Sequence, residues 1–380
     1  MMVASLESGA LLIPFKLAFN HASASRAATQ TLMVVARSKD GINGFGEGCP
    51  REYVTAETLA TTTRFIAAHR ADWLAGLYDV QGLADWGNRH RVEIDAHPAA
   101  WTAVELALLD LCGRVQGRPA EALLGLAPLT GSFRYTAVLG DMSLDQFEAQ
   151  LARYLGMEFR EFKIKLSGDR ARDRSRVQAL RRAGVAPDAV RADANNLWND
   201  ADTAIRDLAA LDYPFFAVEE PVRAGDFSAM RRLALALDTN IILDESMLRV
   251  DQLHQLDGSD VHWIANVRVS KMGGLLRSLE FIEAARGRGL SIIVGAHVGE
   301  TSLLTRAAMT VAMQASDLLL GQEGAFGTHL LSGDIVDRPV MFGRGGVLHA
   351  AASGIGSLPG LGLSVVQPLP FFDSFAAASR

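Results

Sequence analysis

The stretch that decides the fold is Phe162-Lys163-Ile164-Lys165-Leu166, a short apolar run interrupted by two lysines. Similar short runs recur through residues 135–323 at intervals of 25 to 28 residues, with amphipathic helical patterns between them. One strand, one helix and two loops in each interval, repeated eight times, predict a (β/α)₈ barrel. The markers of the eight runs are Val138, Lys165, Asp193, Glu219, Asp244, Lys271, His297 and Glu323.

The residues outside these repeats have a different character. Residues 31–37 and 42–47 predict a hairpin around a turn at 38–41, and helical patterns follow at 56–68 and 99–115. This first third therefore reads as α+β. The tail from Asp334 onward is rich in Gly and Pro and has no ninth repeat, so we expect it to pack back on the N-terminal part.

Size and composition exclude several classes of function. The chain has 380 residues and a formal net charge of −6, and its densest basic run alternates with acids, so nucleic acid is not an expected partner. Its two cysteines, Cys49 and Cys112, lie far apart, which argues against a disulfide framework or a zinc site. Neither a signal peptide nor a membrane-spanning run is recognisable, and we expect a cytoplasmic protein that does not interact with membranes.

Charged residues mark the predicted ends of strands two to six. The active sites of such barrels lie at the carboxyl ends of the strands, where five charges in register are costly unless they serve a site. The carboxylates of Asp193, Glu219 and Asp244 come from adjacent strands and would repel one another without a cation. Hard oxygen ligands favour Mg²⁺, with Mn²⁺ as a substitute. Asn195 is expected on the same strand face as Asp193, in position to orient substrate or metal-bound water.

The lysines are the candidate bases. Lys163 and Lys165 share a strand face by the period-two rule, and their mutual repulsion is expected to lower the pKa of both. A lysine close to neutrality is a usable general base. Lys271 is predicted four strands further round the barrel, so that a substrate would lie between Lys165 and Lys271. This set suits removal of a proton from the carbon beside a carboxylate, because a divalent metal neutralises the enolate that forms.

The sequence resembles the enolase superfamily, in particular the muconate-lactonizing-enzyme subgroup of the mandelate racemase/muconate lactonizing enzyme family. The resemblance covers about residues 10–370. It implies a Mg²⁺-dependent isomerase or lyase with a capping domain over the barrel mouth. The matching motifs are Lys163-Ile164-Lys165, Asp193-Ala194-Asn195, Val218-Glu219-Glu220-Pro221, Asp244-Glu245-Ser246, Lys271-Met272-Gly273-Gly274, Gly44-Phe45-Gly46-Glu47 with Pro50, Ala107-Leu108-Leu109-Asp110, Leu123-Leu124-Gly125 and Pro359-Gly360-Leu361-Gly362.

On this basis we expect an α+β capping domain over residues 1–130, completed by residues 335–380, and a catalytic barrel over residues 131–334. Loops at 19–26 and 51–55 would help to choose the substrate. Glu220 and Glu245 follow metal ligands in the chain, so alternation predicts that they point away from the metal and support the ligands. Relatives of this subgroup are commonly homo-oligomers, and we expect the same here.

Two strand ends depart from the family pattern. On strand seven relatives have a Gly, three further residues and then a Glu, whereas this chain reads Gly295-Ala296-His297-Val298-Gly299-Glu300, with the acid one residue later. Either the loop bulges to bring in Glu300, or His297 takes the inward position. On strand eight, Gln322-Glu323 replaces the Asp-x-Asp with which dipeptide epimerases hold a substrate ammonium group. Glu323 is left either to meet a cationic substrate group or to form a salt bridge at the strand end.

Two fates of the enolate are compatible with these residues. The first is a 1,1-proton transfer that racemises or epimerises an amino-acid derivative or related small-molecule carboxylate. The second is β-elimination, by a dehydratase acting on a hydroxyproline-like acid or by a muconate-type cycloisomerase. A Schiff-base aldolase and a non-catalytic binding barrel are alternatives outside the superfamily.

Overall fold

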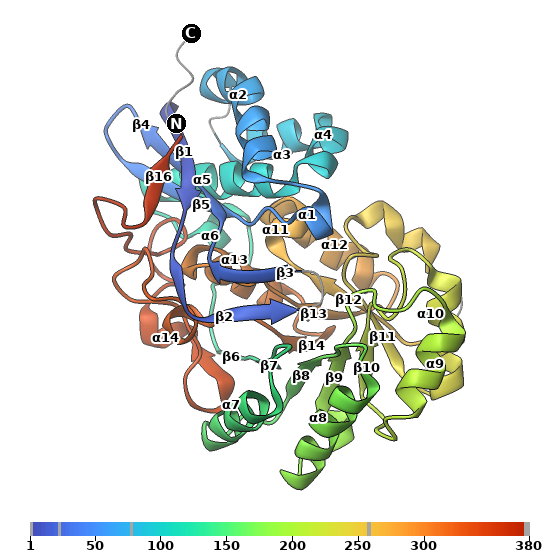
Figure 1. The fold of residues 1–380 in the computed structure, drawn as a ribbon. Helices are drawn as coiled ribbons and strands as arrows, with labels where there is room; N and C mark the ends of the chain where they lie inside the picture. Colours follow the sequence, from blue (N-terminus) through green and yellow to red (C-terminus); the bar gives the residue numbers. More distant parts are fainter. Residues whose placement is uncertain (1–2, 22–23, 77–78, 257–259, 376–380) are drawn as a thin grey trace.

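Alternating strands and helices build a parallel barrel over residues 137–322 of the computed structural model, which describes residues 3–21, 24–76, 79–256 and 260–375 (Figure 1). Eight strands pair in sequence order, and every pair is parallel. The backbone N–H of Thr136 donates to the carbonyl of Gln322 at 2.8 Å, which joins the first strand to the last. The strands are β7 (Ala137–Leu139), β8 (Phe162–Lys165), β9 (Val190–Asp193), β10 (Ala217–Glu219), β11 (Asn240–Leu243), β12 (Trp263–Val267), β13 (Ser291–Val294) and β14 (Leu319–Gln322).

The predicted barrel is therefore confirmed, and helices surround it as the fold requires. Inside the barrel Ala217, Ile242, Ile264 and Ile293 form a small apolar cluster of their own. This cluster closes the floor below the strand ends that carry the charged residues. The barrel helices are α7 (Leu144–Gly156), α8 (Arg170–Arg182), α9 (Ala201–Ala209), α10 (Phe227–Leu237), α11 (Val269–Met272), α12 (Leu275–Arg286) and α13 (Ser302–Gln314).

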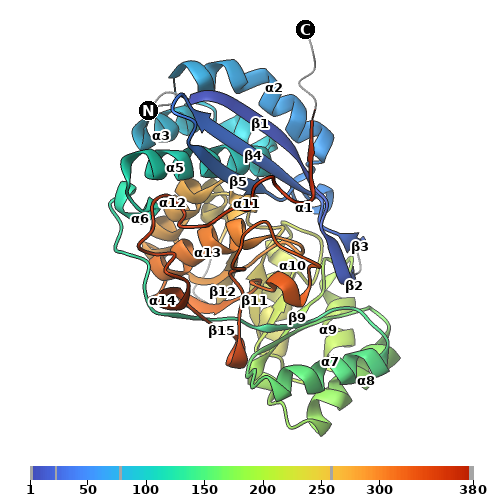
Figure 2. The ribbon, with the colours of Figure 1, turned by 90° about the vertical axis from the view of Figure 1, so that its left-hand side faces the viewer.

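A four-stranded antiparallel sheet, in the order β16-β1-β4-β5, forms the capping domain (Figure 2). β4 (Thr31–Ser38) and β5 (Asn43–Gly48) are the predicted hairpin, and β1 is Val3–Leu11. The last strand, β16 (Phe372–Ser374), pairs with β1, so the tail packs on the N-terminal part as expected. The other elements of this region and the tail are β2 (Pro14–His21), β3 (Ala24–Ala28), α1 (Glu52–Thr55), α2 (Leu59–Gly76), α3 (Val80–Arg89), α4 (Arg91–Ala96), α5 (Pro98–Gln116), α6 (Ala120–Leu123), β6 (Ser132–Arg134), β15 (Val347–His349) and α14 (Ala350–Ser353).

Helix α5 lies directly against β5 because that strand presents glycines to it. A Cβ at Gly46 would lie 2.0 Å from the carbonyl oxygen of Ala103, and one at Gly48 would lie 1.9 Å from that of Ala99. Only residues without a side chain permit this approach. From the other side of α5, Glu105 accepts hydrogen bonds from the backbone of Leu275 and Leu276 at the start of α12. The helix thus joins the capping sheet to the barrel.

Candidate active site

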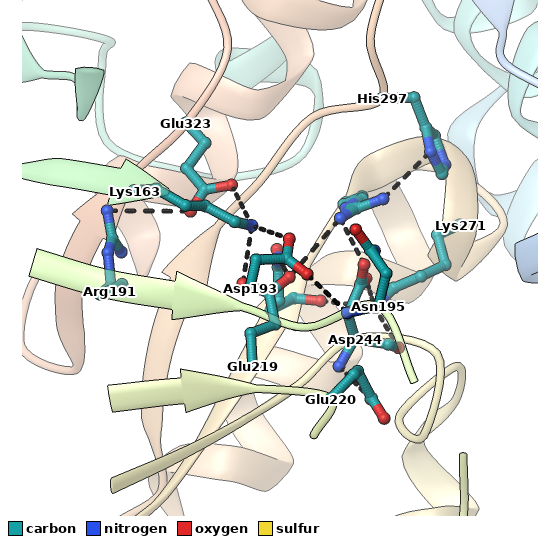
Figure 3. A network of polar contacts seen from close by, with 12 residues as sticks. Lys163, Arg191, Asp193, Asn195, Glu219, Glu220, Asp244, Lys271, His297 and Glu323 are labelled. Atoms are coloured by element: carbon teal, nitrogen blue, oxygen red, sulfur yellow. Dashed lines mark hydrogen bonds and ion pairs between the residues drawn. The ribbon is translucent and has the colours of Figure 1, made fainter. Parts of the chain in front are cut away.

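The carboxyl ends of β8 to β11 bring Lys163, Lys165 and the three predicted carboxylates together (Figure 3). Lys165 is in register with Asp193, and Asp193 with Glu219. Glu219 is in register with Ile242, two residues before Asp244. Paired residues of parallel strands point to the same side, so the side chains of these four charged residues all face the barrel interior.

Lys163 is held among three carboxylates. Its Nζ lies 2.9 Å from Asp193 Oδ2 and 2.7 Å from Glu219 Oε2, and it donates to Glu323 Oε2 at 3.0 Å. Burial acts to lower the pKa of Lys163, but the three carboxylates outweigh it and raise that pKa well above its usual value. The expected lowering by the neighbouring lysine is therefore wrong for Lys163, because its carboxylate partners dominate.

Lys165 lies at the end of β8 and lines the cavity described below. Its Nζ donates to Asp193 Oδ2 at 2.5 Å and to Asn195 Oδ1 at 2.8 Å. Asn195 has a left-handed backbone with φ of 46°, which turns its side chain back to the lysine, and it lines the cavity as predicted. Lys165 is thus aimed by two side chains of the neighbouring strand.

Lys271 does not stand at a strand end, and this prediction is corrected. Strand β12 ends at Val267, and Lys271 belongs to the short helix α11. Its side chain is 0% exposed and donates to Asp244 O, Asp244 Oδ1 and Asn266 O at 2.8, 2.9 and 2.6 Å. It is absent from the cavity lining among the described residues. The interval count failed because a helical turn follows a strand that begins and ends earlier than predicted.

Arg268, which the sequence analysis missed, takes the inward position instead. Ile264, Asn266 and Arg268 follow one another at intervals of two, so they share one face of β12. This alternation in the sequence could have identified Arg268. The Arg268 guanidinium contacts the Asp244 carboxylate, lies 3.8 Å from Glu219 Oε1 and lines the cavity. Burial acts to lower its pKa, but the carboxylates around it raise the pKa further above its usual value.

His297 takes the inward position on the seventh strand end, which resolves the alternative left open by the sequence. The side chain is buried and lines the cavity, and its Nδ1 lies 3.3 Å from Arg268 Nη1. Glu300 accepts a hydrogen bond from the His297 backbone N–H at 2.7 Å instead of lining the cavity. Burial raises the pKa of Glu300 to about 8. The acid therefore supports the loop that presents the histidine.

The two glutamates beside the predicted metal ligands differ. Glu220 turns away as predicted and accepts from Asp244 N, Ser246 N and the Ser246 hydroxyl at 2.6 to 2.7 Å. It thereby fixes the backbone of the Asp244 ligand. Glu245 instead lines the cavity, so the prediction that it points away is wrong. The strand β11 has ended at Leu243, and the alternation rule no longer applies to residue 245.

Glu323, at the end of β14, forms the salt bridge that was one of its two predicted roles. It pairs with Lys163 and lies 3.8 Å from Arg191 Nη2. Its Oε1 accepts no hydrogen bond, and the residue lines the cavity. The prediction of a loop over residues 51–55 is corrected, because Glu52–Thr55 form the short helix α1, and Tyr53 of this helix lines the cavity. The side chains of residues 19–26 lie outside the described part of the structure.

One cavity of about 620 Å³ is lined by Lys163, Lys165, Asn195, Glu245, Arg268, His297 and Glu323, whereas Asp193, Glu219 and Asp244 lie behind this lining. The catalytic end is lined by Lys163, Lys165, Asn195, Arg268 and His297. A cavity of this size suits a small organic ligand. None of the helices in the described ranges has the length and apolar character needed to cross a membrane.

The three predicted metal ligands fit Mg²⁺ in their chemistry. All are carboxylates on adjacent strand ends, and in the part of the chain that the structure describes the buried oxygens Glu219 Oε2 and Asp244 Oδ2 are occupied only by the cationic groups of Lys163 and Arg268. Burial and the neighbouring Asp193 raise the pKa of Glu219 to about 7, which is the repulsion that a divalent cation relieves. Within the described residues, however, no three His, Cys, Asp or Glu side chains stand ready as a metal cage. Lys163 and Arg268 contact these carboxylates and would have to yield to the ion.

Comparison with known proteins gives the same family for both parts of the chain. Residues 3–125 match the N-terminal domain described as mandelate racemase/muconate lactonizing enzyme, and residues 146–367 match the family described as enolase C-terminal domain-like. These spans bracket the domain boundary predicted near residue 130, which stays a prediction.

Relatives of known activity cover most of the chain. The L-Lys-D/L-Arg epimerase of Methylococcus capsulatus is 28% identical over 353 residues, which are 92% of this chain and 94% of that enzyme. Muconate cycloisomerase 1 of Pseudomonas putida is 30% identical over 89% of this chain and 88% of that enzyme. The crystal structure of a dipeptide epimerase from Methylococcus capsulatus, complexed with Mg and the dipeptide L-Arg-D-Lys, is 27% identical, with a TM-score of 0.80 over 96% of this chain and 100% of that chain.

Proposed function

Because the chain belongs to the mandelate racemase/muconate lactonizing enzyme family of the enolase superfamily, we propose that it catalyses a Mg²⁺-dependent 1,1-proton transfer at the carbon beside a carboxylate. The substrate class is a small-molecule carboxylate of the amino-acid-derivative type, in keeping with the epimerases among its relatives. The observation that carries the proposal is that Lys165 and His297 line one cavity from strand ends on different sides of the barrel.

Asp193, Glu219 and Asp244 would hold the metal. When bound, Mg²⁺ supplies positive charge next to the substrate carboxylate, where the negative charge of an enolate develops. Lys163 would contribute a second positive charge at this end of the cavity, beside the carboxylates that it contacts in the absence of the ion. Glu220 and Lys271 hold Asp244 from behind. These contacts position the ligand before substrate arrives.

Lys165 is the proposed base on one side. In its neutral form its Nζ takes the α-proton, and the C–H electron pair moves into the enolate. Asp193 and Asn195 fix the direction of Nζ through the contacts at 2.5 and 2.8 Å. Among the described residues, Lys163 and Lys165 are the lysines that line the cavity, and Lys271 is not in the lining. The lysine pair proposed from the sequence is therefore replaced.

His297 is the proposed acid on the other side. A guanidinium can only donate hydrogen bonds, so the contact from Arg268 makes His297 Nδ1 the acceptor. As an acid His297 has to be the imidazolium, which gives its Nε2 proton to the enolate carbon and becomes the neutral ring; the contact with Arg268 has to open so that Nδ1 can carry its own proton. Protonation from this side inverts the configuration at the α-carbon. In the reverse reaction His297 is the base and Lys165 is the acid.

The test is α-hydrogen exchange in ²H₂O, measured by NMR with both stereoisomers of N-acylated amino acids and dipeptides. We expect both stereoisomers to exchange and to interconvert in the presence of Mg²⁺. Exchange from one stereoisomer alone, without interconversion, would contradict the 1,1-proton transfer. Covalent trapping of the substrate by borohydride would instead indicate a Schiff base.

β-Elimination is the second candidate, and Arg268 favours it. A guanidinium is a permanent cation in this wall and cannot act as an acid at neutral pH. In dehydration or cycloisomerisation, Lys165 would be the one base that acts on the α-proton, and Arg268 could hold a negatively charged group of the intermediate. Release of an unsaturated product, followed by ultraviolet absorbance, would select this candidate.

A further inference from the structure

The cavity extends well beyond the catalytic end. It continues past Val138 and Gly140 at the end of β7 and runs between helix α7 and the segment that follows β14. The α7 side contributes Gln146, Ala149, Gln150, Arg153 and, just beyond the helix, Met157. Spacings of three and four residues place these side chains on one helix face. At 1.5 Å per residue, this face spans about 16 Å. We call this part of the cavity the distal arm.

The opposite wall of the distal arm is apolar and firmly packed. Phe326, Leu330 and Phe342 line it. The Phe342 ring lies 5.4 Å from the Phe326 ring and is stacked on His329 at 4.7 Å. The wall is also tied to the capping domain, because Lys16 N donates to Leu330 O at 2.8 Å. In both ribbon views the β2–β3 hairpin reaches from the capping sheet toward the side of α7 (Figures 1 and 2).

Charge in the distal arm is one-sided. Arg153 is exposed on the arm-facing side of α7, and its guanidinium has no ion pair or hydrogen bond within the described part of the chain. The acid nearest to the arm in the lining, Asp141, is paired with Arg176 at 2.5 Å. Among the described residues, the lining carboxylates Glu245 and Glu323 belong to the catalytic end of the cavity. The part of the arm along α7, from Gln146 to Met157, has no carboxylate among the described residues of its lining. The arm thus offers the guanidinium of Arg153, one helical turn before Met157, beside its apolar wall.

We propose that the distal arm is a substrate subsite for an extended apolar chain that ends in a second anionic group, with Arg153 as the residue that recognises this group. This inference rests on the proposed function, which places the reacting carboxylate beside Lys165. It makes the substrate a dianion, with its two negative groups separated by a spacer that contacts Met157, Phe326 and Phe342. Arg153 is a specificity-determining residue in this proposal, and it takes no part in the proton transfer.

The test compares ligands that differ only in the distal charge. N-suberoyl-L-alanine and shorter N-diacyl-L-alanines are paired with the derivatives whose distal carboxylate is a carboxamide. Binding to the Mg²⁺-loaded enzyme is measured by calorimetry, and α-hydrogen exchange is measured by NMR. We expect one of the longer dianions to bind at least about fivefold more tightly than its carboxamide. The preference should be lost in Arg153→Gln, and in Arg153→Glu the carboxamide should bind more tightly than the dianion.

The matched control is Arg160→Gln, an exposed arginine outside the cavity lining. It should leave the preference for the dianion unchanged, which separates a local contact from the general field of the protein. Equal affinity for carboxylate and carboxamide, an unchanged preference in Arg153→Gln, or no binding of any ligand in the series would overturn the subsite. Tight, Arg153-dependent binding without α-hydrogen exchange would instead contradict the proposed function and leave the subsite standing.

Discussion

Lys271 and Asp244 form a closed pair behind the carboxylate cluster. The Lys271 Nζ donates to both the carbonyl and the carboxylate of Asp244, at 2.8 and 2.9 Å, and its third donor goes to Asn266 O at 2.6 Å. An ammonium group has three donors. All three donors of Lys271 are engaged in this arrangement, and we propose that Lys271 supports the predicted metal ligand Asp244.

The Lys271→Met variant tests this support role. Removing one partner of a buried pair leaves the other charge uncompensated, so we expect a loss of about 3–5 kcal/mol in the free energy of unfolding. Mg²⁺ binding, measured by calorimetry, should weaken as well. Lys39→Met, in the exposed turn before β5, is the control. Unchanged stability together with complete loss of α-hydrogen exchange would point back to a catalytic base.

The roles of Lys165 and His297 predict opposite stereochemical defects. In Lys165→Ala, exchange from the stereoisomer whose α-hydrogen faces the lysine should fall by about 10²–10⁴-fold, the usual size of a general-base effect. In His297→Gln the other stereoisomer should be the one affected. Exchange of each stereoisomer is followed by NMR in ²H₂O. Equal losses for both stereoisomers in both variants would be inconsistent with a two-sided mechanism.

Removal of Mg²⁺ should lower stability as well as activity. The carboxylates of Asp193, Glu219 and Asp244 repel one another, so an ion that binds only the folded state stabilises it by about 2.7 kcal/mol at a hundredfold excess over Kd. Thermal unfolding with EDTA and with added Mg²⁺ measures this difference. The stabilisation should be lost in Glu219→Gln. If Mg²⁺ stabilises this variant as much as the parent, the ion binds elsewhere.

The pair of Glu121 and Arg306 predicts a strong coupling between α6 and barrel helix α13. Both side chains are buried, with two Arg306 nitrogens each 2.8 Å from a Glu121 oxygen. Glu121→Ala should cost about 3–5 kcal/mol in unfolding by urea, whereas the apolar double variant Glu121→Leu/Arg306→Met should recover most of it. The exposed pair of Glu158 and Arg344 is the control, where Glu158→Ala should have a far smaller effect on unfolding. Similar costs at both sites would contradict the role of burial.

Glu105 predicts a pH dependence of stability. Burial raises its pKa from 4.5 to about 7, so between these values the folded chain holds a proton that the unfolded chain has released. The free energy of unfolding should therefore fall as the pH rises from 4.5 to 7, by an amount on the order of a few kcal/mol. In Glu105→Gln this part of the slope should vanish, whereas Glu52→Gln, at an exposed position, should keep it. Urea unfolding at a series of pH values decides between these outcomes.

The sequence by itself determined the barrel and the residues of β8 to β11. The period of the repeats and the two-residue alternation are local properties, and Lys165, Asp193, Glu219 and Asp244 follow from them directly. The placing of Lys271 was wrong because a constant interval does not show where β12 ends and α11 begins. A helical turn changes which residues face inward.

Only the tertiary structure decided what surrounds Lys165. Arg268 and His297 meet because β12 and β13 are neighbours, and Glu323 reaches Lys163 because β14 closes the barrel beside β7. The distal arm depends on how α7 packs against the segment after β14, residues far apart in the chain. Contacts of this kind depend on the closure of the whole barrel, which no local pattern records. The local sequence pattern thus determined the end of β8 that carries Lys165, and the packing determined which side chains face it.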